Sequence, residues 1–158
     1  MLYNNLNRDV ITVFLKLKEE FAMISLIVGK KGTGKTKAII DAANNAKNTE
    51  QGDVIFICDA QRHIYSIDHA VRLIDINEYD HSSFKIFLSF INGVLAQNYD
   101  ITHIFIDSLL KICPEDADNL SDFVTALDTI SAAKNVKFTA TISADASELP
   151  EAVQKYIN

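Results

Sequence analysis

The chain of 158 residues is long enough for one domain with a buried core, and its composition (48% hydrophobic, 23% charged) is ordinary for a globular protein. No apolar run approaches the ~20 residues that span a bilayer, and a net charge of −6 repels the phosphate backbone of nucleic acids. We therefore expect a cytoplasmic protein that neither enters a membrane nor binds nucleic acid, with Cys58 and Cys113 as free thiols.

Residues 7–21 open the chain as a predicted amphipathic helix. Its apolar residues recur at helical spacing: Val10, Phe14, Leu17 and Phe21. We assign residues 1–22 to an N-terminal extension that holds this helix, and residues 23–158 to one domain. The helix either packs on the sheet of its own domain or offers a docking surface for self-association or for a protein partner.

Beyond this helix, short apolar runs alternate with helical patterns. The runs that predict strands are 23–28, 54–58, 71–76, 104–106 and 136–142. The patterns that predict helices are 38–46, 82–96, 120–130 and 150–157. This alternation predicts an α/β fold, in which a parallel β-sheet is covered by helices on both faces. Ligands of such sheets bind at the carboxyl ends of the strands, where four residues are candidates: Gly29, Asp59, Asp107 and Ser143.

Between the first strand and the next helix lies the sequence G-K-K-G-T-G-K-T, which matches the phosphate-loop pattern at every defined position. Its glycines let backbone N–H groups turn inward around phosphate oxygens, and the following helix adds the positive end of its dipole. Lys35 can place its ammonium group on the terminal phosphates, and the Thr36 hydroxyl can ligate Mg²⁺. We predict that the loop binds ATP with Mg²⁺ through all its residues: Gly29, Lys30, Lys31, Gly32, Thr33, Gly34, Lys35 and Thr36.

A second acidic element follows at residues 103–108, which read H-I-F-I-D-S. Three apolar residues in a buried strand deliver Asp107 to the carboxyl edge of the sheet. Magnesium keeps most of its waters and needs few carboxylates, so Asp107 can hold it through water while Thr36 holds it directly. The alternative is an aspartate that only ends a strand.

Residues 29–36 resemble a Walker A motif and residues 104–107 resemble a Walker B motif. This resemblance implies the three-layer fold of the P-loop NTPases. The D-S-L sequence at 107–109 is similar to the end of the Walker B strand in RecA- and KaiC-like ATPases. That similarity implies a magnesium-dependent ATPase of the RecA-like branch.

In the RecA-like branch a further strand is inserted between the two Walker strands and ends in a polar residue that senses the nucleotide. Residues 136–142 fit this strand, with Thr141 and Ser143 as candidates, and we count Ser143 among the nucleotide-binding residues. From Met23 to Tyr156 the chain also resembles short bacterial P-loop proteins that are labelled twitching-motility ATPases. The acidic and histidine boxes of pilus-retraction motors are not found in it.

The catalytic set that we predict is Lys35, Asp59 and Asp107. Many motor ATPases place a glutamate directly after the Walker B aspartate to activate water, but that position is Ser108 here. Asp59 is then the candidate general base, since RecA-like proteins often carry their catalytic acid after the second strand; the alternative is a residue that only ends the strand. Arg62 is the arginine best placed to reach a terminal phosphate, or else it is a solvated loop residue.

These residues predict a weak or partner-stimulated Mg-dependent ATPase. One alternative is a small-molecule kinase, because the extra Gly32 also occurs in kinase loops, although three arginines and no obvious lid argue against it. Another is a nucleotide-binding switch or assembly subunit with negligible hydrolysis, which the missing glutamate favours. A RecA-like sheet places strand 136–142 between strands 23–28 and 104–106, whereas a kinase-like sheet makes the latter two direct neighbours.

Overall fold

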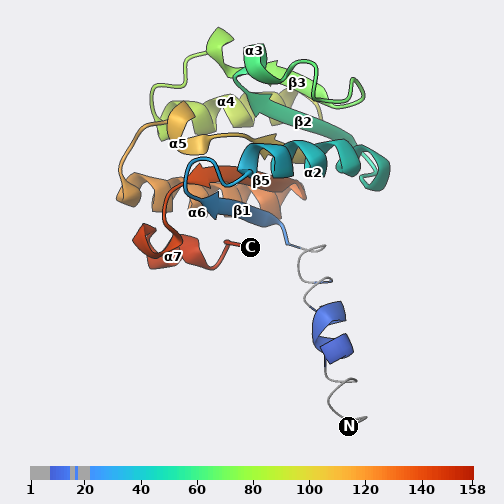
Figure 1. The fold of residues 1–158 in the computed structure, drawn as a ribbon. Coiled ribbons are helices and arrows are strands. Elements are labelled where there is room, and N and C mark those ends of the chain that lie inside the picture. The colour runs from blue at the N-terminus through green and yellow to red at the C-terminus, as the bar shows by residue number, and fades with distance from the viewer. Residues whose placement is uncertain (1–7, 15–16, 18–21) are drawn as a thin grey trace.

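The structure is a computed structural model that describes residues 8–14, 17 and 22–158. Its centre is a sheet of five parallel strands in the order β1-β5-β4-β2-β3 (Figure 1). The strands are β1 (Ile24–Gly29), β2 (Asp53–Cys58), β3 (Arg72–Asp75), β4 (Ile101–Ile106) and β5 (Lys137–Ser143). The parallel sheet predicted from the alternation of strands and helices is therefore confirmed.

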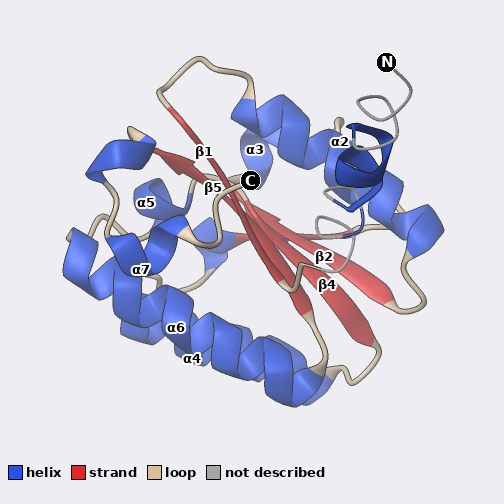
Figure 2. Cartoon of the chain, turned by 90° about the horizontal axis from the view of Figure 1, so that it is seen from below, coloured by secondary structure: helices blue, strands red, loops and turns tan. Residues whose placement is uncertain are grey.

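Long and short helices connect the strands. The long ones are α2 (Lys35–Thr49), α4 (Phe84–Gln97) and α6 (Ala117–Lys134). The short ones are α3 (Ala60–His63), α5 (Leu109–Ile112) and α7 (Glu151–Gln154), with 3₁₀ turns at η1 (Ile76–Glu78) and η2 (Ala146–Glu148). Figure 2 shows α4 and α6 on one face of the sheet and α2 on the other. Helices thus cover both faces, as predicted, and the fold has three layers.

The side chains of β2 alternate between two hydrophobic cores. Ile55 and Ile57 belong to the larger core, which α4 and α6 cover, whereas Val54, Phe56 and Cys58 belong to the smaller core beneath α2. None of these five residues is more than 3% exposed. Burial on both faces explains why the strand reads as a continuous apolar run rather than as an alternating pattern.

Strand β5 differs from β2 because only one of its faces is apolar. Phe138, Ala140 and Ile142 lie in the larger core. Because successive side chains of a strand point to opposite faces, Thr139 and Thr141 face the side of α2, where both are buried. The strand therefore carries buried hydroxyl groups towards the helix that follows the phosphate loop.

The two strands that carry the Walker-like sequences are not neighbours. Strand β5 pairs with β1 along its whole length, with Gly29 opposite Ser143, and with β4 on its other side, with His103 opposite Lys137. This is the order that the RecA-like resemblance implies, and it differs from the direct pairing of a kinase-like sheet.

The predicted boundaries of β4 were wrong by three residues. The strand begins at Ile101, which is buried and pairs with Asp53 of β2. Thr102 and His103 interrupt the apolar run, and that interruption moved the predicted start to residue 104. Both residues are only partly buried, so polar side chains are tolerated in this part of the strand.

The closing helix is also shorter than predicted. It was expected over residues 150–157, but α7 ends at Gln154. The chain then returns to the edge of the sheet, where the N–H of Leu26 donates to the carbonyl of Tyr156 at 2.8 Å and the N–H of Asn158 donates to the carbonyl of Leu26 at 3.1 Å. These bonds satisfy the exposed edge of β1, which explains why the chain leaves its helical path.

At the N-terminus, residues 8–14 and 17 are helical, and the rest of the helix predicted over 7–21 lies outside the described residues. Figure 1 shows this segment projecting from the body of the fold. Its described apolar side chains are exposed, from 45% for Leu17 to 68% for Phe14, so they do not pack on the sheet. Within the described ranges, no helix is long and apolar enough to cross a membrane.

Candidate functional site

The loop that was predicted to bind phosphate connects β1 to α2 at the carboxyl edge of the sheet. Gly32 and Gly34 both have φ of 83°, a left-handed conformation that side chains disfavour. Gly34 is the N-cap of α2 and supplies no side-chain cap, whereas the Ser83 hydroxyl caps α4 by accepting from the N–H of Ile86 at 3.2 Å. The first N–H groups of α2 therefore suit a phosphate oxygen as acceptor.

A cavity of about 520 Å³ lies over this loop, and we call it the loop cavity. Its walls come from the loop, from α3 and α5, and from the end of β5. Lys31 lines this cavity, whereas Lys30 forms an ion pair with Asp145 at 3.9 Å. Ser143 lines it as well, together with Thr141. The structure thus brings most of the predicted loop residues and the tip of β5 to one cavity, whereas Gly29, Lys30 and Thr33 are not among the residues that line it.

The Lys35 ammonium group lies over its own loop. Its Nζ donates to the backbone carbonyl of Lys30 at 2.8 Å and lies 3.4 Å from the Thr33 hydroxyl. Thr33 Oγ1 in turn donates to the carbonyl of Lys30 at 2.7 Å. The ammonium group is therefore held at the rim of the loop cavity, within reach of any anion that the loop N–H groups bind.

Thr36 and Asp107 come together although 71 residues separate them in the sequence. The Thr36 hydroxyl lies 3.4 Å from both carboxylate oxygens of Asp107. Asp107 is only 4% exposed, and it also accepts a hydrogen bond from the Thr141 hydroxyl at 2.7 Å. His63 Nε2 lies 3.5 Å from its other oxygen. These polar contacts offset the cost of burying the carboxylate.

The residue after Asp107 adopts an unusual backbone conformation. Ser108 has φ of 60° and ψ of 53°, the left-handed region, where a residue with a Cβ is strained by about 1–2 kcal/mol. Its N–H donates to the Thr141 hydroxyl at 2.6 Å, and the same hydroxyl donates to Asp107. Thr141 therefore holds both the carboxylate and the strained turn that leads into α5.

A second cavity of about 160 Å³ adjoins the first at the carboxyl ends of β2, β3 and β4, and we call it the side cavity. Its polar lining includes Asp59, His63, Asn77 and His81, with Asp107 at the boundary. Its volume exceeds the roughly 30 Å³ that one water occupies in the liquid. The side cavity therefore has room for several waters or for a small polar molecule.

Asp59 begins α3 but does not cap it with its side chain. Its carboxylate accepts from the Asn77 amide at 3.2 Å and lies 3.8 Å from Nε of Arg62. Asn77 also donates to Asp75 at 3.0 Å. The candidate base is thus engaged by an amide and by a guanidinium group, and its carboxylate faces the side cavity near Asp107.

Four polar residues of the site were not singled out from the sequence: His63, Asn77, His81 and Lys111. They lie on short segments (α3, η1, α5 and the turn before α4) that are too short to show helical periodicity. Their one sequence signal was position, because each follows the end of β2, β3 or β4 within a few residues. The prediction relied mainly on the residues directly after each strand. Residues further along these segments also reach the carboxyl edge of the sheet, because the segments fold back over it.

Thr36 and Asp107 are the residues that could hold a magnesium ion. In the part of the chain that the structure describes, no group of three or more His, Cys, Asp or Glu side chains could hold a metal. This fits magnesium, which usually takes one or two protein oxygens together with water and phosphate oxygens. A hydroxyl and a buried carboxylate 3.4 Å apart, beside the loop cavity, would therefore suit Mg²⁺ that arrives with a nucleotide.

Cys58 lies behind the site and does not contribute a reactive thiolate. Burial raises the pKa of its thiol to about 12, and the nearby carboxylates of Asp107, Asp75 and Asp59 add to the effect. Both cysteines are free and buried, as expected. A thiol that stays protonated is a poor nucleophile, so the chemistry of the site rests on its carboxylates and cations.

In comparisons with known proteins, no protein-family model matches the chain, and no curated protein matches it.

Proposed function

We propose that this chain binds Mg-ATP in the loop cavity and hydrolyses it slowly. The observation that carries the proposal is the meeting of Thr36 and Asp107, 3.4 Å apart, at the end of a loop whose sequence fits the phosphate-loop pattern. A hydroxyl and a carboxylate in this relation are what a magnesium ion bridging the β- and γ-phosphates requires. Lys35 and the N–H groups of the loop supply the complementary positive charge.

The order of the sheet supports a RecA-like P-loop NTPase over a kinase, because β5 lies between β1 and β4. Within that branch, Asp59 is the candidate base, but it is engaged by Asn77 and Arg62. Ser108 offers no carboxylate to orient water. Slow turnover follows, and we propose that self-association or a protein partner raises it, with the exposed N-terminal helix as the docking element and the cytoplasm as the compartment.

A nucleotide-binding switch with negligible hydrolysis is the second candidate. The contacts on Asp59 favour it, because a carboxylate that already accepts an amide N–H and faces a guanidinium group is a weaker general base. The two candidates share the binding step and differ in turnover.

Thermal melting tests the binding step. With Mg-ATP at about a hundredfold excess over its Kd, linkage raises the melting temperature by roughly 5–10 °C for a chain of this size. Lys35→Ala should lose most of this rise, whereas Lys85→Ala, an exposed lysine on α4, should keep it. A wild-type protein whose melting temperature does not move at millimolar nucleotide would remove the central claim.

Phosphate release tests the chemical step. We expect release slower than the ~1–100 s⁻¹ typical of kinase turnover, and rising with protein concentration. Transfer of labelled phosphate to a pool of small metabolites would instead favour the kinase, and retained binding without release or transfer would favour the switch. Fast release that is independent of protein concentration and lost in Asp59→Asn would show that the slow-turnover proposal is wrong.

A further inference from the structure

The loop cavity and the side cavity share a wall. Four residues line both cavities: Thr36, Arg62, Ser108 and Lys111. Thr36 and Ser108 flank Asp107, the proposed metal ligand, from the two sides. The other two are the cations of the shared wall. This wall therefore carries two positive side chains together with Thr36, a proposed magnesium ligand.

The cations near the loop differ in whether they already have a partner. Arg62 pairs with Asp59, Lys30 with Asp145, and Lys37 with Asp41. Lys35 is hydrogen-bonded within the loop. The side chains of two lysines make no hydrogen bond or ion pair to any residue that the structure describes: Lys31 and Lys111. Lys111 lies on the shared wall, whereas Lys31 lines only the loop cavity.

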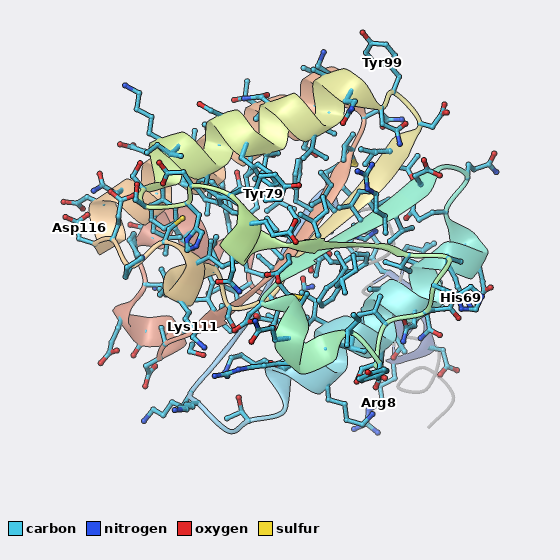
Figure 3. The ribbon with its side chains drawn as sticks, turned by 90° about the horizontal axis from the view of Figure 1, so that it is seen from above. Arg8, His69, Tyr79, Tyr99, Lys111 and Asp116 are labelled. Carbon is cyan, nitrogen blue, oxygen red and sulfur yellow. The ribbon has the colours of Figure 1, made fainter. Side chains whose placement is uncertain are left out.

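The backbone that carries Lys111 is held firmly. Helix α5 is anchored by Leu109 and Ile112, which are 0% and 5% exposed. The N–H of Lys111 donates to the carbonyl of Ser108 at 2.9 Å, and Ser108 is in turn fixed by Thr141. Lys111 is labelled in Figure 3, beside α5. A fixed backbone therefore holds a cationic side chain, without a partner among the described residues, at the wall of both cavities.

The terminal phosphate is the anion that this position suits. Magnesium in P-loop proteins bridges the β- and γ-phosphates, and Thr36 and Asp107 mark its place here. If a nucleotide bound in the loop cavity with its metal held by Thr36 and Asp107, the wall that carries Ser108 and Lys111 would lie near its γ-phosphate. We propose that Lys111 contacts the γ-phosphate and makes the site prefer a nucleoside triphosphate over a diphosphate. This inference rests on the proposed binding of Mg-ATP in the loop cavity.

Lys111 then supplies from within the chain the charge that other P-loop enzymes receive from an arginine finger. A contact made only with the γ-phosphate separates ATP from ADP, while contacts made by the loop act on both. Removing the ammonium group should therefore reduce affinity for the triphosphate alone. An interaction between charged groups of this kind changes affinity by about tenfold.

Titration calorimetry with the full chain tests this selectivity. The probes are Mg-ADP and the magnesium complex of a non-hydrolysable ATP analogue. Lys111→Ala should weaken binding of the analogue about tenfold and leave binding of Mg-ADP within about twofold. Lys111→Arg, which keeps the charge, should retain most of the preference. Lys85→Ala is the matched control, an exposed lysine on α4 that should change neither affinity.

The outcomes separate the inference from the proposed function. One contrary outcome is a Lys111→Ala variant that binds both nucleotides as the wild type does; another is an equal loss of affinity for both. Either would show that Lys111 does not contact the γ-phosphate, although the loop would remain a nucleotide site. If the wild type binds neither nucleotide, the proposed function fails and this inference fails with it. Because Lys111 is exposed, the variants should fold, and their melting temperatures without nucleotide check this.

Discussion

Partly buried ionisable groups lie at both ends of strands β4 and β5, and the two ends differ in how fully these groups are paired. At the amino ends of β4 and β5, Glu50 accepts from Lys137 at 2.8 Å and lies 3.3 Å from His103, whose other ring nitrogen is 2.9 Å from the Thr139 hydroxyl. The imidazole also stacks on the Phe105 ring at 3.9 Å between centroids. Here every charge has a partner within the cluster.

At the carboxyl ends of the same strands the contacts are incomplete. Asp107 has a close donor in Thr141 and longer contacts to Thr36 and His63, and it lines the side cavity. Lys111 has no partner among the described residues, and Ser108 is strained. The amino-end cluster is complete without a ligand, whereas the carboxyl-end cluster leaves charge and space for one. If the proposed nucleotide binding is right, stability and binding depend on different ends of one sheet.

The largest effect should come from Asp107→Asn at the carboxyl end. If Asp107 holds magnesium, this change should reduce the magnesium dependence of ATP binding at least tenfold, because an amide is a much weaker ligand for a hard cation. Binding of free ATP should change much less. Titration calorimetry with and without Mg²⁺ measures both affinities, and Asp122→Asn, an exposed aspartate on α6, is the control. Equal affinities for Mg-ATP and free ATP in both variants would take Asp107 out of the metal site.

The next effect should come from Glu50→Gln at the amino end. The change removes the carboxylate that pairs with Lys137 and contacts His103, and it should lower the free energy of unfolding by about 2–3 kcal/mol while leaving nucleotide affinity unchanged. Urea denaturation and titration calorimetry provide the two readouts. Glu148→Gln, an exposed glutamate in η2, should change neither quantity. A Glu50→Gln variant with weakened nucleotide binding would mean that the two ends are coupled.

Two threonines of β5 sharpen the comparison because they lie two residues apart on the same face. Thr141→Val removes the donor to Asp107 and the acceptor of Ser108, so it should lower both nucleotide affinity and stability, the latter by about 1–3 kcal/mol. Thr139→Val loses only its bond with His103 and should lower stability by about 1 kcal/mol with no change in affinity. Matching losses of nucleotide affinity in the two variants would show that the division between the ends is wrong.

The last effect concerns pH. Burial lowers the pKa of His103 from its ordinary 6.5 to about 4, so below pH 6.5 the unfolded chain binds a proton that the folded chain does not. Stability should fall as the pH drops from 6.5 towards 4, by at most about 1.4 kcal/mol per pH unit from this group. Burial raises the pKa of Glu50, but the smaller lowering effects together outweigh it, the hydrogen bond from Lys137 first among them. The lowered pKa of Glu50 adds to the loss at the acid end.

His103→Gln isolates this contribution. The variant should show a flatter decline in the free energy of unfolding between pH 6.5 and 4, measured by urea denaturation at each pH. The other carboxylates are unchanged in the variant, so the difference between the two curves belongs to the His103 cluster. Parallel curves for wild type and variant would show that His103 does not titrate in this window.

The sequence predicted those features that depend on a local pattern. Continuous apolar runs located the parallel strands, and the spacing of glycines with Lys35 and Thr36 located the loop, because backbone conformation and burial leave direct traces in residue type. The same reasoning placed Asp107 at a strand end. Its partners there depend on how strands distant in the sequence are ordered, and only the resemblance to RecA-like proteins bore on that order.

The rest of the site lies on segments whose structure leaves no periodic pattern of apolar residues in the sequence. His63, Asn77 and Lys111 reach the shared edge from segments of three or four residues, which are too short for helical spacing to appear. The left-handed turn at Ser108 was equally hidden, since serine is not a residue that marks such a conformation. Thr139 escaped notice because its role depends on the neighbouring strand, where His103 lies opposite Lys137.

The turn at Ser108 also limits how the proposed ATPase activity could be raised by protein engineering. The obvious substitution is Ser108→Glu, which would restore the residue that many motor ATPases carry. With φ near 60°, however, that position favours glycine or asparagine, and a glutamate would keep the backbone strain without the compact side chain. A designer would do better to leave the turn intact and to place a new carboxylate on the side-cavity wall, at Asn77 or His81.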